Sequence, residues 1–150
     1  IEDNYNQLSE NIRLNNYNNV KKYNLALSSS KGKALMWVTN KKKTGGYSIF
    51  SENDVELKKY NKRKIYETSV FTDKGDNILK IENKKIAIKI DVERHEKLVL
   101  EGLKELITKN KIFLQIEIFD HLHPDIDSFL IKYNFNYLNK VEKNFFYKNY

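Results

Sequence analysis

The sequence predicts an α/β fold with a mostly parallel sheet. Two short apolar runs, 86–91 and 112–118, enclose one amphipathic segment, 95–107. A strand, a helix and a second strand in this order are typical of a right-handed parallel crossover. Strand-like and helix-like segments also alternate along the rest of the chain, which favours a single α/β arrangement.

Apolar residues at helical spacing predict a helix near the start of the chain. Tyr5, Leu8 and Ile12 place this helix over 4–16, and the Asn-rich stretch 15–19 ends it with a turn. Strands are expected over 20–27, 34–39 and 65–71, with a loop over 28–32 and a lysine-rich turn that contains Gly45 and Gly46. A short helix or turn is expected over 73–81.

The second half of the chain has the clearer pattern. Residues 86–90 form a short, mostly apolar run that is typical of a strand buried on both faces, and the run ends at Asp91. An apolar stripe predicts a helix over 95–107, and another strand follows over 112–119. Pro124 suits the first turn of a further helix. Aromatic runs over 135–138 and 145–150 predict a C-terminal antiparallel hairpin.

The composition indicates one domain. The chain has 150 residues, of which 40% are apolar, enough for a buried core. It has no cysteine, which excludes disulfides and thiolate metal sites. No apolar run approaches the roughly 20 residues that span a bilayer. The first residues contain neither Met nor an apolar stretch, so we expect no signal peptide, a natural start further upstream and a cytoplasmic protein.

The formal net charge of +7 raises the question of a nucleic-acid partner. Nearly all of this charge is lysine, and arginine occurs only at Arg13, Arg63 and Arg94. Bidentate recognition of phosphate and guanine usually relies on arginine. We therefore favour a solvated lysine surface over a nucleic-acid interface.

Segment 89–96, Lys-Ile-Asp-Val-Glu-Arg-His-Glu, follows an expected strand and opens an expected helix. Ligands of α/β sheets bind beyond the carboxyl ends of the strands, where Asp91 would face them. Acids in a first helical turn also complement the helix dipole, by about 0.3–1 kcal/mol each. The pattern alone leaves both interpretations open.

Two histidines, His121 and His123, lie close in sequence to Asp120 and Asp125. They could form part of a metal site. No further ligand accompanies them, so we favour a polar loop before Pro124 and expect no metal.

Several motifs resemble the FkbM-type methyltransferases. Residues 89–106, KIDVERHEKLVLEGLKEL, resemble the family pattern K-I-D-V-E-G-x-E followed by V-L-x-G. The IEI at 116–118, the LSENIRLN at 8–15 and the ALS at 26–28 followed by Gly32 also resemble family segments. These matches occur in the family's order and span nearly the whole chain.

This resemblance implies a Rossmann-like class I methyltransferase fold, with helices on both faces of a mostly parallel sheet. The chain would then be the C-terminal two-thirds of one methyltransferase domain, lacking the first strand and its glycine-rich cofactor loop. The implied function is S-adenosylmethionine-dependent O-methylation of a small-molecule or sugar hydroxyl. A nucleic-acid methyltransferase and a non-catalytic α/β binding module are the alternatives.

The resemblance also implies roles for individual residues. Glu2, Leu27, Ser28 and Asp91 would bind the cofactor, with Glu2 accepting hydrogen bonds from the ribose hydroxyls. Asp91 and Glu93 would be catalytic. His95 stands at an unspecified position of the family pattern and is the best-matched base on chemical grounds, because its ordinary pKa lies near 6.5; a histidine on the helix surface is the alternative. Glu96 and Glu117 would bind the acceptor.

The clearest departure from the family pattern is Arg94, which stands where the family has glycine. If the backbone there needs a positive φ or a close approach to a ligand, the arginine side chain would strain or crowd the site.

Overall fold

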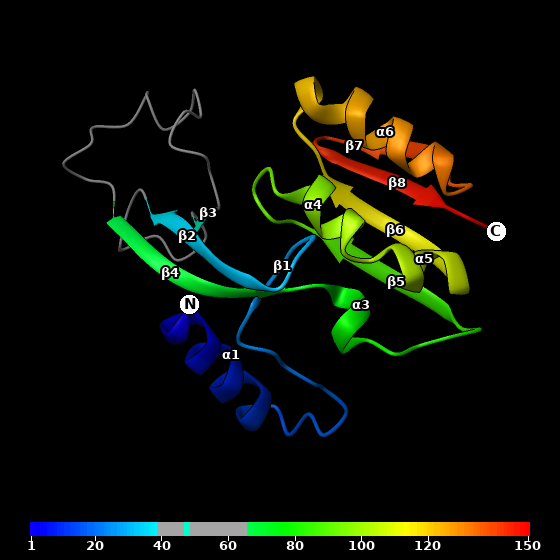
Figure 1. Cartoon of the computed structure of the whole chain (residues 1–150). Helices are drawn as coiled ribbons and strands as arrows, with labels where there is room; N and C mark the ends of the chain where they lie inside the picture. The colour runs from blue at the N-terminus through cyan, green and yellow to red at the C-terminus, as the bar shows by residue number, and fades with distance from the viewer. Residues whose placement is uncertain (39–46, 49–65) are drawn as a thin grey trace.

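The computed structural model describes residues 1–38, 47–48 and 66–150. Within them the strands form two four-stranded sheets, ordered β1-β4-β2-β3 and β5-β6-β8-β7 (Figure 1). The fold is therefore α/β, as expected. The expected lysine-rich turn with Gly45 and Gly46 lies outside the described residues.

The first sheet is built on an antiparallel pair. Strands β2 (Gly32–Val38) and β4 (Tyr66–Asp73) pair along their length, and β3 (Tyr47–Ser48) lies against the end of β2. Strand β1 (Ala26–Leu27) pairs parallel with the end of β4. The strand expected over 20–27 has only these two residues, and Val20 and Tyr23 before them are about half exposed.

The second sheet contains the predicted crossover. Strands β5 (Lys85–Ile90) and β6 (Lys111–Glu117) are adjacent and parallel, with Ile90 opposite Ile116. Strands β7 (Asn136–Val141) and β8 (Asn144–Lys148) form the predicted C-terminal antiparallel hairpin, and β8 also pairs antiparallel with β6.

The prediction of a mostly parallel sheet was wrong. Among the described strand pairings, only β1–β4 and β5–β6 are parallel. Parallel neighbours need a long crossover connection; the connection between β5 and β6 is one, whereas β7 and β8 are joined by a tight turn that allows only antiparallel pairing.

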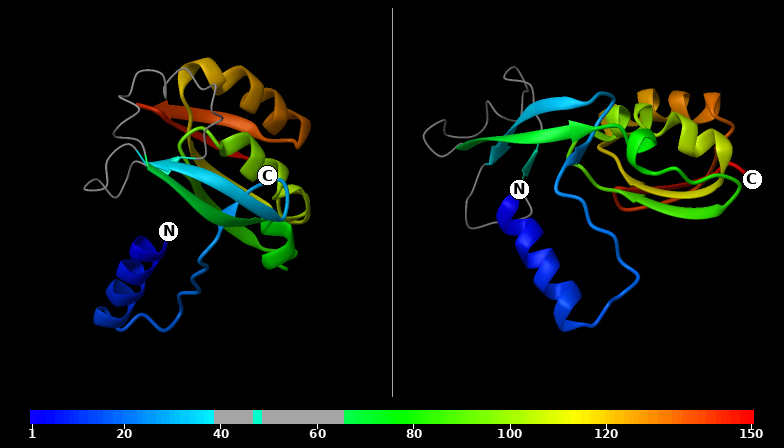
Figure 2. Two further views of the ribbon diagram at one scale, coloured as in Figure 1. Left: turned by 60° about the vertical axis from the view of Figure 1, so that its left-hand side comes forward. Right: turned by 60° about the horizontal axis from the view of Figure 1, so that its bottom comes forward.

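Strand β5 is not buried on both faces, contrary to its apolar sequence. It is the edge strand of its sheet in the described structure. Ile86, Ile88 and Ile90 point toward the helices, whereas Ala87 and Lys89 are exposed on the other side. The three helices that pack on this sheet lie on one face of it, not on both (Figure 2). They are α4 (Glu96–Glu101), α5 (Lys104–Lys109) and α6 (His123–Lys132).

The helix expected over 95–107 is divided into α4 (Glu96–Glu101) and α5 (Lys104–Lys109). A side chain from another helix binds the start of α5. Asp76, on the short helix α3 (Gly75–Ile78), accepts hydrogen bonds from the backbone N–H groups of Glu105 and Leu106, both at 2.9 Å. The first N–H groups of a helix have no partner within the helix. A carboxylate from another element therefore caps α5.

The core lies between these helices and the second sheet. Its buried residues come from β5, β6, β8 and the three helices, and include Ile90, Leu100, Ile107, Ile112, Leu114, Ile116, Leu130, Phe145 and Tyr147. The helix around Pro124 is confirmed as α6, after the short 3-10 turn Asp120–Leu122. Asn149 ties β6 to α5, accepting a hydrogen bond from Ile112 N–H and donating to Ile107 C=O.

The predicted N-terminal helix is confirmed as α1 (Glu2–Leu14). None of its residues is buried, and it stands away from the two sheets, with its N-terminal end nearest to them (Figures 1 and 2). Lys22, in the segment that follows, places its ammonium 5.2 Å from the centre of the Tyr5 ring. The position of α1 therefore depends on its N-terminal end and this segment.

Two glycines mark where the first sheet meets the helices. A Cβ on Gly102 would overlap the carbonyl oxygen of Ser28, and a Cβ on Gly75 would overlap the Leu103 side chain. Gly102 C=O also accepts the N–H of Asp76 at 2.9 Å, and Ser28 N–H donates to Asp73 C=O at 2.9 Å. The end of the first sheet thus rests directly on the backbone between α4 and α5.

We expect Gly102→Ala to lower the free energy of unfolding by about 1–3 kcal/mol, the usual cost of overpacking. Gly75→Ala should cost less, because its new methyl group meets a side chain that can rotate and not a backbone carbonyl. Chemical denaturation of both variants measures the difference. Equal stability of Gly102→Ala and the wild-type chain would contradict this account of the junction.

Candidate functional site

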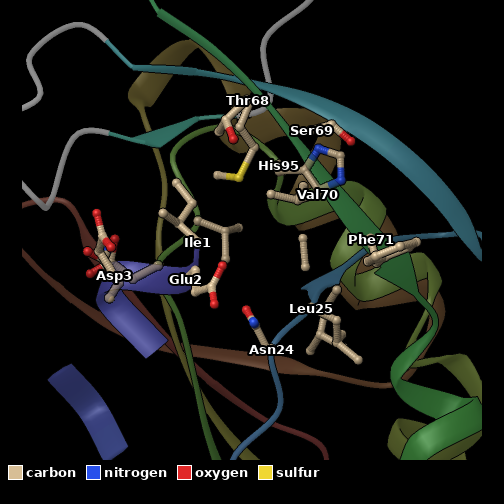
Figure 3. A pocket seen from close by; sticks show the side chains of 16 residues that line it. Ile1, Glu2, Asp3, Asn24, Leu25, Thr68, Ser69, Val70, Phe71 and His95 are labelled. Atoms are coloured by element: carbon tan, nitrogen blue, oxygen red, sulfur yellow. The ribbon is translucent and has the colours of Figure 1, made fainter. Parts of the chain in front are cut away.

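A cavity of about 700 Å³ lies between the N-terminal end of α1, the first sheet and the loop that follows β5 (Figure 3). Its lining comes from segments far apart in sequence: 1–4, 24–27, Met36, 68–71, Asp91, Val92 and His95. Ligand pockets of proteins have volumes in this range and combine an apolar lining with a few polar groups. Here Glu2 and Asp91 supply carboxylates and His95 an imidazole.

His95 is held by Ser28. The His95 Nε2 and the Ser28 Oγ form a hydrogen bond of 3.0 Å, and each residue is only 8% exposed. Burial lowers the pKa of His95 below its ordinary value of 6.5. The imidazole is therefore neutral at neutral pH and can accept a proton.

Asp91 directly follows β5, and Glu117 ends the neighbouring strand β6. The Lys89 ammonium lies 2.8 Å from an Asp91 carboxylate oxygen, and this hydrogen bond holds the pKa of Asp91 below its usual value. Burial raises the pKa of Glu117, the carboxyl of Asp91 adds to the rise, and the charge of Lys143 opposes it. The pKa values of the two carboxyls thus shift in opposite directions, downward for Asp91 and upward for Glu117.

The loop after Asp91 has an unusual backbone. Glu93 has φ 51° and Arg94 has φ 76°, in the left-handed region that glycine adopts freely and larger residues adopt at a cost. The expectation from the family pattern, that a side chain at Arg94 meets a strained backbone, is met. The loop closes on Glu96, whose carboxylate accepts the N–H of Arg94 at 2.9 Å.

Glu96 lies in the core with an exposed fraction of 1%. Burial raises the pKa of its carboxyl, while hydrogen bonds from the backbone oppose the rise. Its second carboxylate oxygen, Oε2, has no hydrogen-bond partner among the described residues. From the core, the Glu96 carboxylate holds the loop through the N–H of Arg94. Glu96 is not among the residues that line the cavity. Contact between Glu96 and an acceptor therefore stays a prediction from the sequence.

The histidines near Pro124 have other partners. His123 Nε2 forms a hydrogen bond of 2.9 Å with the hydroxyl of Tyr147, and its ring stacks on Phe145 with the ring centres 4.3 Å apart. Asp120 pairs with Lys140 at 2.6 Å. In the part of the chain that the structure describes, no group of three or more acidic, histidine or cysteine side chains is placed to hold a metal ion.

The structure brings four of the expected site residues to one cavity: Glu2, Leu27, Asp91 and His95. Ser28 stands behind His95, and Glu117 beside Asp91. The sequence did not indicate the opposite wall, formed by Met36 and by Thr68 to Phe71. Alternation in that segment predicts a strand but not which part of the molecule it faces. Likewise, nothing in the sequence connects Asp76 with the helix that it caps.

Among the described residues, no helix combines the length and the apolar character that a membrane crossing requires.

Comparison with protein families gives a match over most of the chain. The family model described as the methyltransferase FkbM domain matches residues 1–137. The searches among curated proteins and among solved structures found no match.

The buried His95 gives an expected dependence of stability on pH. Its pKa is lower in the folded than in the unfolded chain, so between the two values the unfolded chain binds the extra proton. The stability that His95 contributes is therefore complete above about pH 6.5 and is lost as the pH falls toward its folded pKa. The free energy of unfolding, measured from pH 7.5 to 5, should fall more steeply in the wild-type chain than in His95→Gln.

His121→Gln is the matched control, because His121 is exposed. Parallel pH profiles of the wild-type chain and His95→Gln would show that burial does not hold His95 neutral.

Proposed function

The chain belongs to the FkbM methyltransferase family and is a methyltransferase that uses S-adenosylmethionine, and we propose that it methylates a hydroxyl oxygen of a small molecule or sugar. The observation that supports this proposal is the shared cavity of Glu2, Asp91 and His95. It combines carboxylates for a polar, cationic cofactor with a neutral base for a hydroxyl proton. We propose further that residues 1–150 form a single domain, whose two sheets are parts of the family's Rossmann-like fold.

The residues of the cavity fit the cofactor. Glu2, at the start of α1, presents an exposed carboxylate suited to the two hydroxyls of a ribose. Leu25, Leu27 and Val92 supply apolar surface for an adenine ring. Asp91, kept ionised by Lys89, carries the negative charge that favours a sulfonium.

Bound S-adenosylmethionine supplies a methyl group that is already activated by its positively charged sulfur. The protein must then place the acceptor oxygen in line with that methyl group and remove the hydroxyl proton. We assign the alignment of the acceptor oxygen to Asp91 and Glu93, which both lie in the loop after β5. We assign the removal of the hydroxyl proton to His95, which lines the cavity. Its imidazole is neutral because burial lowers its pKa.

Asp91→Asn should lower the turnover of methyl transfer in the full-length protein by about 10²-fold or more, because the amide keeps the shape of the side chain and loses its charge. Asp125→Asn is the matched control: Asp125 also pairs with a lysine, Lys97 at 3.1 Å, but lies on α6 outside the cavity. Circular dichroism checks the fold of both variants. A folded Asp91→Asn protein with wild-type turnover would remove Asp91 from the mechanism.

Glu93→Gln should mainly raise the KM for the acceptor and change kcat less, because we assign Glu93 to the position of the acceptor hydroxyl. Initial rates over a range of acceptor concentrations separate the two constants. A fall in kcat at unchanged KM would assign Glu93 to the chemical step instead.

The wild-type rate should rise with pH through one apparent pKa that lies below 6.5, because burial lowers the pKa of His95. His95→Ala should lose this step and fall by about 10²–10⁴-fold at neutral pH, the usual contribution of a general base. If the step persists in His95→Ala at the same pH, another group is the base.

A further inference from the structure

Glu96 is a buried carboxylate at the end of the loop that follows β5. It is the first residue of α4, and its exposed fraction is 1%. Val99 and Leu100, on the same helix, belong to the core that α4 shares with the second sheet. Burial of a carboxylate is unfavourable unless other groups compensate it. This cost favours a role for Glu96 that an apolar side chain in the same place could not fill.

The carboxylate of Glu96 binds the backbone of the preceding loop. Its Oε1 accepts the N–H of Arg94 at 2.9 Å. Burial raises the pKa of the carboxyl, and the backbone at Glu96, Arg94 and Val92 opposes the rise. Backbone groups that lower the pKa of a buried acid are those that stabilise its charge. The interaction between the Glu96 side chain and the loop therefore extends from Val92 to the first turn of α4.

The loop needs this support because two of its residues have an unfavourable backbone conformation. Glu93 has φ 51° and Arg94 has φ 76°, a region that residues with a Cβ adopt at a cost. Residues in such conformations persist where the surrounding structure holds them. The hydrogen bond to Glu96 holds the second of the two residues, Arg94.

The two left-handed residues lie between groups that line the cavity. Asp91 and Val92 precede them in the chain, and His95 follows them. The conformation of 93–94 therefore decides where the imidazole of His95 lies relative to the carboxylate of Asp91. Ser28 holds the ring of His95 through the bond of 3.0 Å, whereas Glu96 holds the backbone that carries this ring.

We propose that Glu96 is a positioning residue for methyl transfer, which keeps Arg94 in the left-handed conformation and so places Asp91 and His95 correctly beside the cavity. The tasks of Asp91 and His95 in that reaction rest on the proposed function. Glu96 acts through the loop, and this role needs no contact between Glu96 and the acceptor.

The test compares two substitutions at Glu96 in the full-length protein. Glu96→Gln keeps an oxygen that can accept the N–H of Arg94, whereas Glu96→Met keeps a side chain of similar length without that acceptor. The first readout is the pKa of His95, measured by NMR from the ¹³C signals of its ring. In the wild-type chain this pKa should lie below 6.5, because His95 is buried. It should stay there in Glu96→Gln and rise toward 6.5 in Glu96→Met, because a displaced loop exposes the ring to water.

The second readout is the affinity for S-adenosylmethionine, measured by calorimetry. Glu96→Met should weaken it about tenfold, the loss of one charge-assisted contact, because Asp91 no longer lies in place beside the sulfonium. Glu96→Gln should bind the cofactor like the wild-type protein. Glu105→Met is the matched control, because Glu105 is an exposed residue of α5 whose carboxylate lies 3.8 Å from the Lys109 ammonium. It should leave both readouts at their wild-type values.

Chemical denaturation checks that each variant is folded at the temperature of the measurements. Unchanged readouts in folded Glu96→Met, or equal changes in Glu96→Met and Glu96→Gln, would overturn the role of Glu96. If Glu96→Met does not fold, hydrogen exchange in the wild-type protein decides: the amide of Arg94 should exchange slowly, and exchange at the rate of an open loop would overturn the proposal. Because no methyl transfer is measured, failure here leaves the proposed O-methylation standing; an inactive protein with the expected readouts would refute the activity alone.

Discussion

The contact between the carbonyl of Ser28 and the backbone at Gly102 is the constraint on which the rest of the structure depends. It allows the end of the first sheet to rest on the point where α4 and α5 meet, and Asp76 secures the same point by capping α5. With Ser28 held there, its hydroxyl reaches His95 at 3.0 Å. The cavity exists because the first sheet is anchored on the helices that cover the second.

The cavity lies beyond the carboxyl end of β5, where Asp91, Val92 and His95 form part of its lining. Ionised Asp91 and neutral His95 both line the cavity. Environment separates the charges: Lys89 keeps Asp91 ionised, and burial keeps His95 neutral. Groups with such different environments can divide the tasks of binding a cationic cofactor and accepting a proton.

Local sequence patterns predicted most helices and strands, but they predicted strand pairing only where the connecting segment constrains it. The run before Asp91 and its partner 112–118 were predicted to be adjacent parallel strands, because a long amphipathic connection allows little else. The break at Gly102 could not be predicted, since its capping carboxylate, Asp76, lies 29 and 30 residues from the amides that it binds. Family resemblance predicted Glu2 and Leu27. The place of Asp91 after a strand also indicated that residue, and the ordinary pKa of histidine suggested His95. No local signal showed that 68–71 would face them or that Glu96 would be buried.

The most direct test of the account is an NMR titration of the ¹⁵N-labelled full-length protein with S-adenosylmethionine. We propose that the cofactor binds in the cavity between α1, the first sheet and the loop after β5. Its binding should then cause saturable changes at the amides of Leu27, Ser28 and the segment 91–95, with little change in α6. Changes confined to α6 and the β7–β8 hairpin, with the amides of 27–28 and 91–95 unaffected, would contradict this site.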